Sequence, residues 1–246
     1  MEGPQIRIYA DRLRSWAGRR LARVSGDRAS QAEMFVGQPL PMAVSYGKRI
    51  YLPFDEAALR LHCLMFGDLR FNETRDKRIT LRVDFDGGDF FLLTLGAATH
   101  VPLADMSEIE PWRDLADPAF DRARVSRDLT THTGDAAVCD LLLDQDRLPG
   151  LGNKIKNEAL WMARVHPLTM WRELSSAKRR QVLQACLDFA PELATALLEC
   201  RKSRHAIYRA RKCPRCGTPI EHADLGELNR RCHWCPRCQE KTLPLA

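Results

Sequence analysis

Two Cys-x2-Cys pairs near the end of the chain constrain its folding more than any other feature. Cys213-Pro-Arg-Cys216 and Cys235-Pro-Arg-Cys238 are separated by residues 217–234. Pairs at such a separation bring four thiolates around one tetrahedral Zn²⁺. We therefore predict one structural zinc ion held by Cys213, Cys216, Cys235 and Cys238. Cys232 breaks the paired spacing, and we treat it as a bystander.

Basic side chains surround these cysteine pairs. They are Arg209, Arg211, Lys212, Arg215, Arg230, Arg231 and Arg237. A small zinc-held hairpin covered with guanidinium groups suits contact with nucleic-acid phosphates. The alternative is that the zinc only fixes the C-terminal segment and that the charges solvate its surface. The pattern favours DNA contact.

Length and composition limit the class of protein. The chain has 246 residues with a formal net charge of +6, enough for one large domain or two modest domains plus a finger. It contains no apolar run near the length of a membrane span and no signal-peptide pattern at its N-terminus. We therefore expect a cytoplasmic protein without a membrane partner, in which the nine cysteines are reduced or bind metal.

The hydrophobic pattern predicts an α+β protein. A partly amphipathic helix is expected over residues 5–17, and residues 104–135 are polar and suggest a linker. Short apolar runs predict strands at 21–24, 43–45, 49–52, 59–63, 79–85 and 90–95, which is typical of a sandwich or barrel. Helical periodicity follows at 136–144, 154–163, 176–189 and 191–200.

A glycine-rich turn precedes one of these helices. Leu148-Pro-Gly-Leu-Gly-Asn153 leads into a helix that opens with Asn153 and Lys154. Exposed N–H groups at a helix start attract phosphate, and these two side chains add donors. An ordinary helix–helix turn with an asparagine cap explains the same residues. Local chemistry alone leaves both interpretations open.

Residues 145–168 closely resemble the helix–two-turn–helix of the formamidopyrimidine-DNA glycosylase and endonuclease VIII (Fpg/Nei) family. Glu-Gly-Pro-Gln-Ile at 2–6 resembles the N-terminal motif of that family, and 45–52 resembles its Gly-Lys strand. The cysteine pairs resemble its zinc finger. The matches follow the family order over nearly the whole chain.

The resemblance implies a three-part architecture. An N-terminal helix and β-sandwich would occupy residues 1–118, the helix–two-turn–helix domain 119–203, and the zinc finger 204–246. Double-stranded DNA carrying a damaged base or an abasic site would lie in a basic cleft between the domains. The protein would be a monomer associated with the bacterial-type nucleoid through DNA.

The resemblance also implies the chemistry. Family members flip a damaged nucleotide out of the duplex, and an N-terminal amine attacks its C1′, expels the base and leaves a Schiff base that is eliminated. The amine would belong to Met1, and Glu2 would shuttle protons. Lys48 would hold the phosphate near the lesion.

The remaining site residues would bind the DNA. Asn153 would grip a neighbouring phosphate together with Lys154, and Arg230, or Arg231 with a small change of register, would bind phosphate from the finger. Leu64, Met65 and Phe66 would fill the gap left by the flipped base, because apolar wedges offset lost stacking. Three consecutive large apolar residues cannot face one side of a strand, which favours a loop tip over a core strand.

The chain departs from the family pattern in several places. Met1 is followed directly by Glu2, so the usual proline nucleophile is missing, and we expect Met1 to be retained. Gln5 replaces a second glutamate. Residues 95–101 lack the Arg-Arg-Phe-Gly element, and the chain between Ala190 and Cys213 is too short for a lesion-capping loop. Both gaps favour the Nei-like branch.

These departures leave other functions open. The leading prediction is a bifunctional DNA glycosylase and abasic-site lyase that acts on oxidised bases or abasic sites. The alternative is a non-catalytic paralogue that binds damaged or distorted DNA. A zinc-ribbon factor of transcription or RNA processing would explain the finger but not residues 2–5, Lys48 or 145–168.

Overall fold

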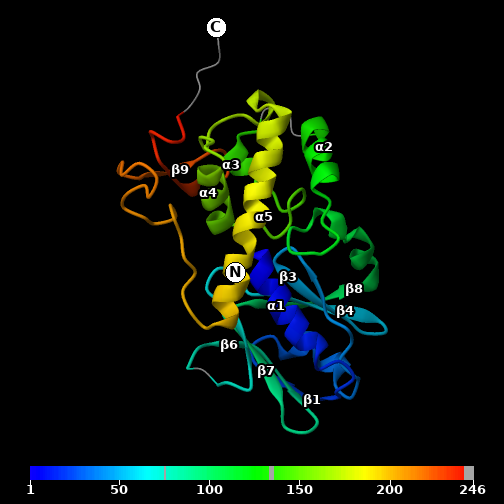
Figure 1. Ribbon diagram of the computed structural model, residues 1–246. Helices are drawn as coiled ribbons and strands as arrows, with labels where there is room; N and C mark the ends of the chain where they lie inside the picture. Colours follow the sequence, from blue (N-terminus) through cyan, green and yellow to red (C-terminus); the bar gives the residue numbers. More distant parts are fainter. Residues whose placement is uncertain (75, 133–135, 241–246) are drawn as a thin grey trace. The chain divides into compact units, whose positions relative to one another are not determined.

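The computed structural model describes residues 1–74, 76–132 and 136–240. It divides into two compact units, residues 1–110 and 111–246 (Figure 1). The first unit combines one long helix with two sheets, and the second combines four helices with a small hairpin. The predicted α+β class is confirmed. The finer boundaries at residues 118 and 203 stay predictions.

The first helix, α1 (Gly3–Arg14), begins directly after Glu2. Glu2 and Gln5 form a capping box, in which the backbone N–H of Glu2 donates to Gln5 Oε1 at 3.2 Å. Pro4 in the first turn has no N–H to satisfy and so suits this position. The helix starts two residues earlier and ends three residues earlier than the predicted 5–17. Gln5 therefore has a structural role as a cap.

The first unit contains two four-stranded antiparallel sheets. In the order of their pairing, one consists of β1 (Leu21–Ser25), β6 (Ile79–Phe85), β7 (Phe90–Thr94) and β5 (Asp68–Phe71). The other consists of β2 (Val44–Tyr46), β3 (Arg49–Pro53), β4 (Ala57–His62) and β8 (Ala97–Pro102). The sequence predicted six of these strands and missed β5 and β8.

Aromatic side chains form much of the core of the first unit. The ring of Trp16, just after α1, meets Phe71 and Phe85 edge to face with centroids 5.3 and 5.5 Å apart. Phe35 stacks on Phe54 at 4.2 Å. Helix α1 also contacts β2 and β3. These contacts fix the start of the chain against both sheets. Trp16 contacts the sheet that contains β5 and β6, and α1 contacts the sheet that contains β2 and β3.

The helices of the second unit are α2 (Arg122–His132), α3 (Val138–Leu141), α4 (Asn153–Met162) and α5 (Ser176–Leu198). Helix α5 continues through Pro191, where two separate helices were predicted. Proline removes one helical hydrogen bond, but buried Phe189 and Leu193 on either side keep the helix packed. The predicted linker 104–135 contains α2 and short 3₁₀ turns.

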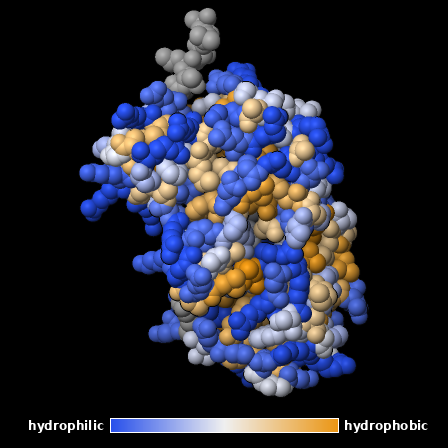
Figure 2. Space-filling view, in the orientation of Figure 1, coloured by the Kyte–Doolittle hydropathy of each residue, from blue (hydrophilic) through white to orange (hydrophobic). Residues whose placement is uncertain are grey.

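The last described elements are β9 (Glu221–Leu225) and β10 (Arg230–Trp234), which form the antiparallel hairpin of the finger. Strand β10 packs against α4. Figure 2 shows mainly hydrophilic residues on the visible face of this region. Within the described ranges, none of the helices combines the length and the apolar character that a membrane span requires.

Candidate active site and metal centre

The start of α1 places Met1 and Glu2 at a defined point. Glu2 is only 7% exposed and serves as the N-cap, so the amine of Met1 lies just before the first turn. The positive charge of this amine lowers the pKa values of both His62 and Cys63. Burial is the larger effect on Cys63 and raises the pKa of its thiol to about 12. The amine therefore lies near the end of β4.

Lys48 follows Gly47 in the turn between β2 and β3. Gly47 has φ of 60°, a left-handed conformation that glycine adopts without strain. Burial lowers the pKa of His62, and the positive charges of Arg49, the N-terminal amine and Lys48 lower it further. Lys48 and the amine of Met1 are thus both near enough to His62 for their charges to lower the pKa of its imidazole. The sequence analysis assigned no catalytic role to His62, whose only signal was its place two residues before the apolar triplet.

Leu64, Met65 and Phe66 form the tip of the loop between β4 and β5. Their exposed fractions are 46%, 68% and 75%, which confirms the predicted loop tip. Gly67 closes the loop by donating its N–H to Cys63 O at 2.9 Å. A Cβ at Gly67 would lie 2.4 Å from the carbonyl oxygens of both Cys63 and Thr94, so no larger residue fits. The use of this tip as a wedge in DNA stays a prediction.

Asn153 and Lys154 open helix α4, as the sequence predicted. The N-cap is Gly152, which has no side chain to cap the helix, so the interpretation of Asn153 as the cap is wrong. The side-chain Oδ1 of Asn153 is buried without a hydrogen-bond partner among the described residues. The positive charge of Lys154 helps to lower the pKa of His205, after burial as the main cause.

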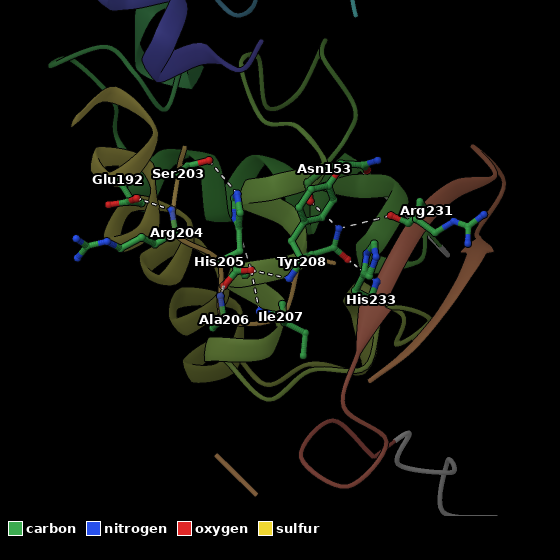
Figure 3. A network of polar contacts seen from close by, with 12 residues as sticks. Asn153, Glu192, Ser203, Arg204, His205, Ala206, Ile207, Tyr208, Arg231 and His233 are labelled. Carbon is green, nitrogen blue, oxygen red and sulfur yellow. Dashed lines mark hydrogen bonds and ion pairs between the residues drawn. The ribbon is translucent and has the colours of Figure 1, made fainter. Parts of the chain in front are cut away.

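Glu158 on α4 binds the segment that leads into the finger, whose residues Ala206, Ile207 and Tyr208 are labelled in Figure 3. Its carboxylate is 2% exposed and accepts the backbone N–H groups of Ala206, Ile207 and Tyr208 at 2.9, 3.0 and 2.8 Å. Burial raises the pKa of Glu158, and the three donors oppose that rise. The sequence analysis missed this role, because the partners lie far along the chain.

Two further side chains hold the hairpin against the helices. Asn157 Oδ1 accepts the N–H of His233 at 2.7 Å. The carboxylate of Asp140 in α3 accepts the N–H groups of Glu227 and Leu228, at 2.9 and 3.1 Å, in the turn between β9 and β10. These bonds make the position of the finger depend on α3 and α4.

The four predicted metal ligands meet at one point. The sulfur atoms of Cys213, Cys216, Cys235 and Cys238 all lie within 4.8 Å of one another. Three of the Sγ–Sγ distances are 3.4, 3.5 and 3.9 Å. Tetrahedral bonds of about 2.3 Å to zinc would separate sulfur atoms by roughly 3.8 Å. The four residues fit one tetrahedral metal ion, and Cys232 is outside the set.

The structure distinguishes the two candidate arginines of β10. Arg231 makes a two-point contact with Asp224 on the facing strand, with distances of 2.8 and 3.2 Å. Arg230 is exposed, and the described residues offer its side chain no ion pair. The guanidinium of Arg230 is therefore the more available of the two. The predicted phosphate contacts of Lys48, Asn153 and Arg230 involve both units and stay predictions.

Comparison with known proteins agrees with this arrangement. A family profile described as the formamidopyrimidine-DNA glycosylase H2TH domain matches residues 113–197. Formamidopyrimidine-DNA glycosylase of Rhodococcus jostii strain RHA1 is 30% identical over an alignment of 247 positions, and the alignment covers 86% of this chain and 82% of the relative. Endonuclease 8-like 3 of Mus musculus is 27% identical over 221 residues, covering 85% of this chain and 36% of the relative. This chain thus spans about a third of the length of that vertebrate relative.

Solved structures share the fold. The crystal structure of a viral DNA glycosylase superposes with a TM-score of 0.86 at 22% identity, covering 97% of this chain and 100% of the other. The Lactococcus lactis Fpg in complex with abasic-site DNA gives 0.82 at 19% identity, covering 98% and 100%. The H2TH match, the metal-site cysteines and the similarity to the Rhodococcus enzyme lead to one conclusion: this chain belongs to the formamidopyrimidine-DNA glycosylase (Fpg/Nei) family.

Proposed function

We propose that this protein is a DNA repair glycosylase with abasic-site lyase activity. The observation that carries the proposal is the grouping of an N-terminal amine, buried Glu2 and Lys48 in the first unit. The charges of the amine and of Lys48 both lower the pKa of His62, which lies two residues before the exposed apolar tip. A nucleophile, an acid–base group and a phosphate-binding cation therefore accompany a wedge suited to a gap in stacked bases.

The amine of Met1 would act as the nucleophile in protein whose mature N-terminus is Met1. It would attack C1′ of the flipped nucleotide, and the base would leave with a proton delivered by Glu2. The resulting Schiff base would lose the 3′ phosphate by β-elimination. An α-amine has an ordinary pKa of about 7.7–8.0, so a useful fraction is neutral near neutral pH. A lysine ammonium needs a much larger shift, which leaves Lys48 to bind phosphate.

The second unit would grip the duplex. Asn153 and Lys154 would bind one phosphate at the start of α4, and Arg230 would bind another from the finger. The metal ion would be a single structural Zn²⁺ that holds the finger in shape. Substrates would be double-stranded DNA with an oxidised base or an abasic site, and the protein would act as a cytoplasmic, nucleoid-associated monomer.

The decisive experiment is borohydride trapping on duplex DNA with one abasic site. Mass spectrometry first establishes that the purified protein begins with a free amine at Met1. We expect a reduced protein–DNA adduct that maps to the N-terminal peptide. Glu2→Gln should bind the duplex as well as the parent but release a damaged base more slowly. Lys48→Ala should weaken binding, whereas Lys77→Ala, which changes an exposed lysine of the same unit, should not.

Two results would change the assignment. An adduct that maps to a lysine would overturn the role of Met1 but keep the lyase. Tight binding of damaged duplex without any adduct would favour the non-catalytic DNA-binding paralogue. Glu2 also caps α1, so its burial alone does not separate the two assignments, and the trapped adduct decides between them.

A further inference from the structure

Trp161 lies near the C-terminal end of α4, where the finger packs against the helix. Its indole N–H donates to Cys213 Sγ, with 3.4 Å between the nitrogen and the sulfur. Cys213 is one of the four metal-site cysteines. The donor is therefore a helix side chain from outside the two Cys-x2-Cys pairs, and it contacts a sulfur that would bind the metal directly.

Arg215, which lies between the two cysteines of the first pair, packs on the same indole. The central carbon of its guanidinium lies 4.3 Å from the centroid of the Trp161 ring, which is a cation–π contact. The guanidinium also donates from Nη1 to Trp161 O at 3.2 Å. The first cysteine pair thus contacts Trp161 in three ways, through a sulfur, a cation and a hydrogen bond to its backbone.

The second cysteine pair is fixed to the same region by Gln239. This side chain is fully buried, and its Oε1 accepts the N–H of Cys235 at 2.9 Å. Its Nε2 donates to Val165 O, also at 2.9 Å. Both pairs are therefore bound to residues 161–165, and the metal ion would be held beside the end of α4.

We propose that Trp161 is a positioning residue of the metal centre, whose N–H holds Cys213 as a metal-bound thiolate and makes that sulfur less reactive. A thiolate is a nucleophile as well as a metal ligand. An N–H that donates to the sulfur stabilises its negative charge, and partners of this kind orient a ligand and tune metal affinity. Loss of the N–H should loosen the metal and make Cys213 more reactive towards electrophiles.

The alternative is that the indole only packs against the finger. Packing and hydrogen bonding predict different effects on the electrons of the Cys213 sulfur, because only the N–H withdraws charge from it. The proposal concerns the metal centre and does not depend on the glycosylase activity.

The first measurement is zinc release from the full-length, zinc-loaded protein in excess chelator. Trp161→Phe keeps an aromatic ring without an N–H and should release zinc about tenfold faster than the parent. Arg215→Ala keeps the indole donor and should accelerate release by about threefold, the size of one cation–π contact. Trp112→Phe is the matched control and should release zinc at the parent rate, because Trp112 stacks with Arg113 and Arg124 outside the finger.

Cobalt substitution separates hydrogen bonding from packing. The sulfur-to-cobalt charge-transfer absorption should move to longer wavelength in Trp161→Phe, because a sulfur without its donor is richer in electrons. It should move less in Arg215→Ala and stay in place in Trp112→Phe. Iodoacetamide should alkylate Cys213 of zinc-loaded Trp161→Phe before the other three metal-site cysteines, as mass spectrometry of digests would show.

The unaltered protein gives a test that needs no variant. After loading with an NMR-active isotope of cadmium, the indole proton of Trp161 should show scalar coupling to the metal through the hydrogen bond. Absence of this coupling would overturn the proposal. So would an unmoved charge-transfer band in folded Trp161→Phe, a shift of equal size in Arg215→Ala, or equal rates of zinc release from Trp161→Phe and Trp112→Phe. Far-UV circular dichroism establishes that each variant is folded.

Discussion

Replacing Glu158 by Gln tests how firmly the segment before the finger is tied to α4. Glu158 Oε1 accepts two N–H groups, from Ile207 and Tyr208, and Oε2 accepts one from Ala206. Glutamine has the same shape but only one acceptor oxygen. If that oxygen keeps the first two donors, the new amide NH₂ group faces the N–H of Ala206, and one charge-assisted hydrogen bond is lost.

The free-energy cost follows from these contacts. Hydrogen bonds to a charged group contribute about 1.5–3 kcal/mol each, and a buried donor left unsatisfied costs about 1–3 kcal/mol. Glu158→Gln should therefore reduce the free energy of unfolding by about 2 kcal/mol. Glu158→Ala leaves all three donors of residues 206–208 unpaired and should cost at least about 3 kcal/mol, a large share of the stability of a typical domain.

Urea denaturation of the zinc-loaded protein, followed by far-UV circular dichroism, measures this change. The matched control is Glu199→Gln, because Glu199 is exposed and, within the part of the chain that the structure describes, its side chain pairs with Arg201 alone. The control should stay within about 0.5 kcal/mol of the parent. A loss for Glu158→Gln no larger than that of the control would refute the view that this carboxylate anchors the segment.

Three further predictions follow. Arg230→Ala should lower DNA affinity for all sequences and reduce the slope of log K against log salt by about one. Arg231→Ala should change affinity and slope less, because Asp224 already neutralises that guanidinium. Filter binding at several salt concentrations compares the two variants. Gly67→Ala should destabilise the first unit measurably in thermal unfolding, since its Cβ would overlap two carbonyl oxygens. Hydrogen bonds from Arg201 lower the pKa of Glu192 from its ordinary value of 4.5 to about 2. The stability that the Glu192 carboxylate contributes is therefore complete above pH 4.5 and is lost as the pH falls from 4.5 towards 2. Glu192→Gln should flatten that part of the curve of unfolding free energy against pH.

The sequence was most informative where function depends on spacing. The cysteine pairs predicted the four-sulfur cluster, and the glycine-rich turn predicted the start of α4, since both signals are local. The triplet 64–66 was correctly placed at a loop tip by the alternation rule for strands. In each case the signal lies in a short stretch of sequence, the longest being residues 213–238 for the two cysteine pairs.

The sequence failed where partners are distant. Strand β5 (Asp68–Phe71) alternates charged with apolar residues over only four positions, and β8 (Ala97–Pro102) is short and weakly apolar, so neither stands out until its neighbour is known. Lys156 and Cys232 looked like an ordinary helical lysine and a spare cysteine. Their contact joins α4 to β10, and no local period encodes such a pairing.

In the loop that ends at Gly67, one residue fixes the backbone and other residues form the exposed surface. Its backbone is fixed by a glycine that no other residue can replace, while the side chains of residues 64–66 project outward and contribute little to the core. Selection can therefore exchange the three side chains without refolding the loop. The exposed side chains can change while the loop backbone stays the same. Sequence variation among close relatives should therefore concentrate at residues 64–66 and stop at Gly67.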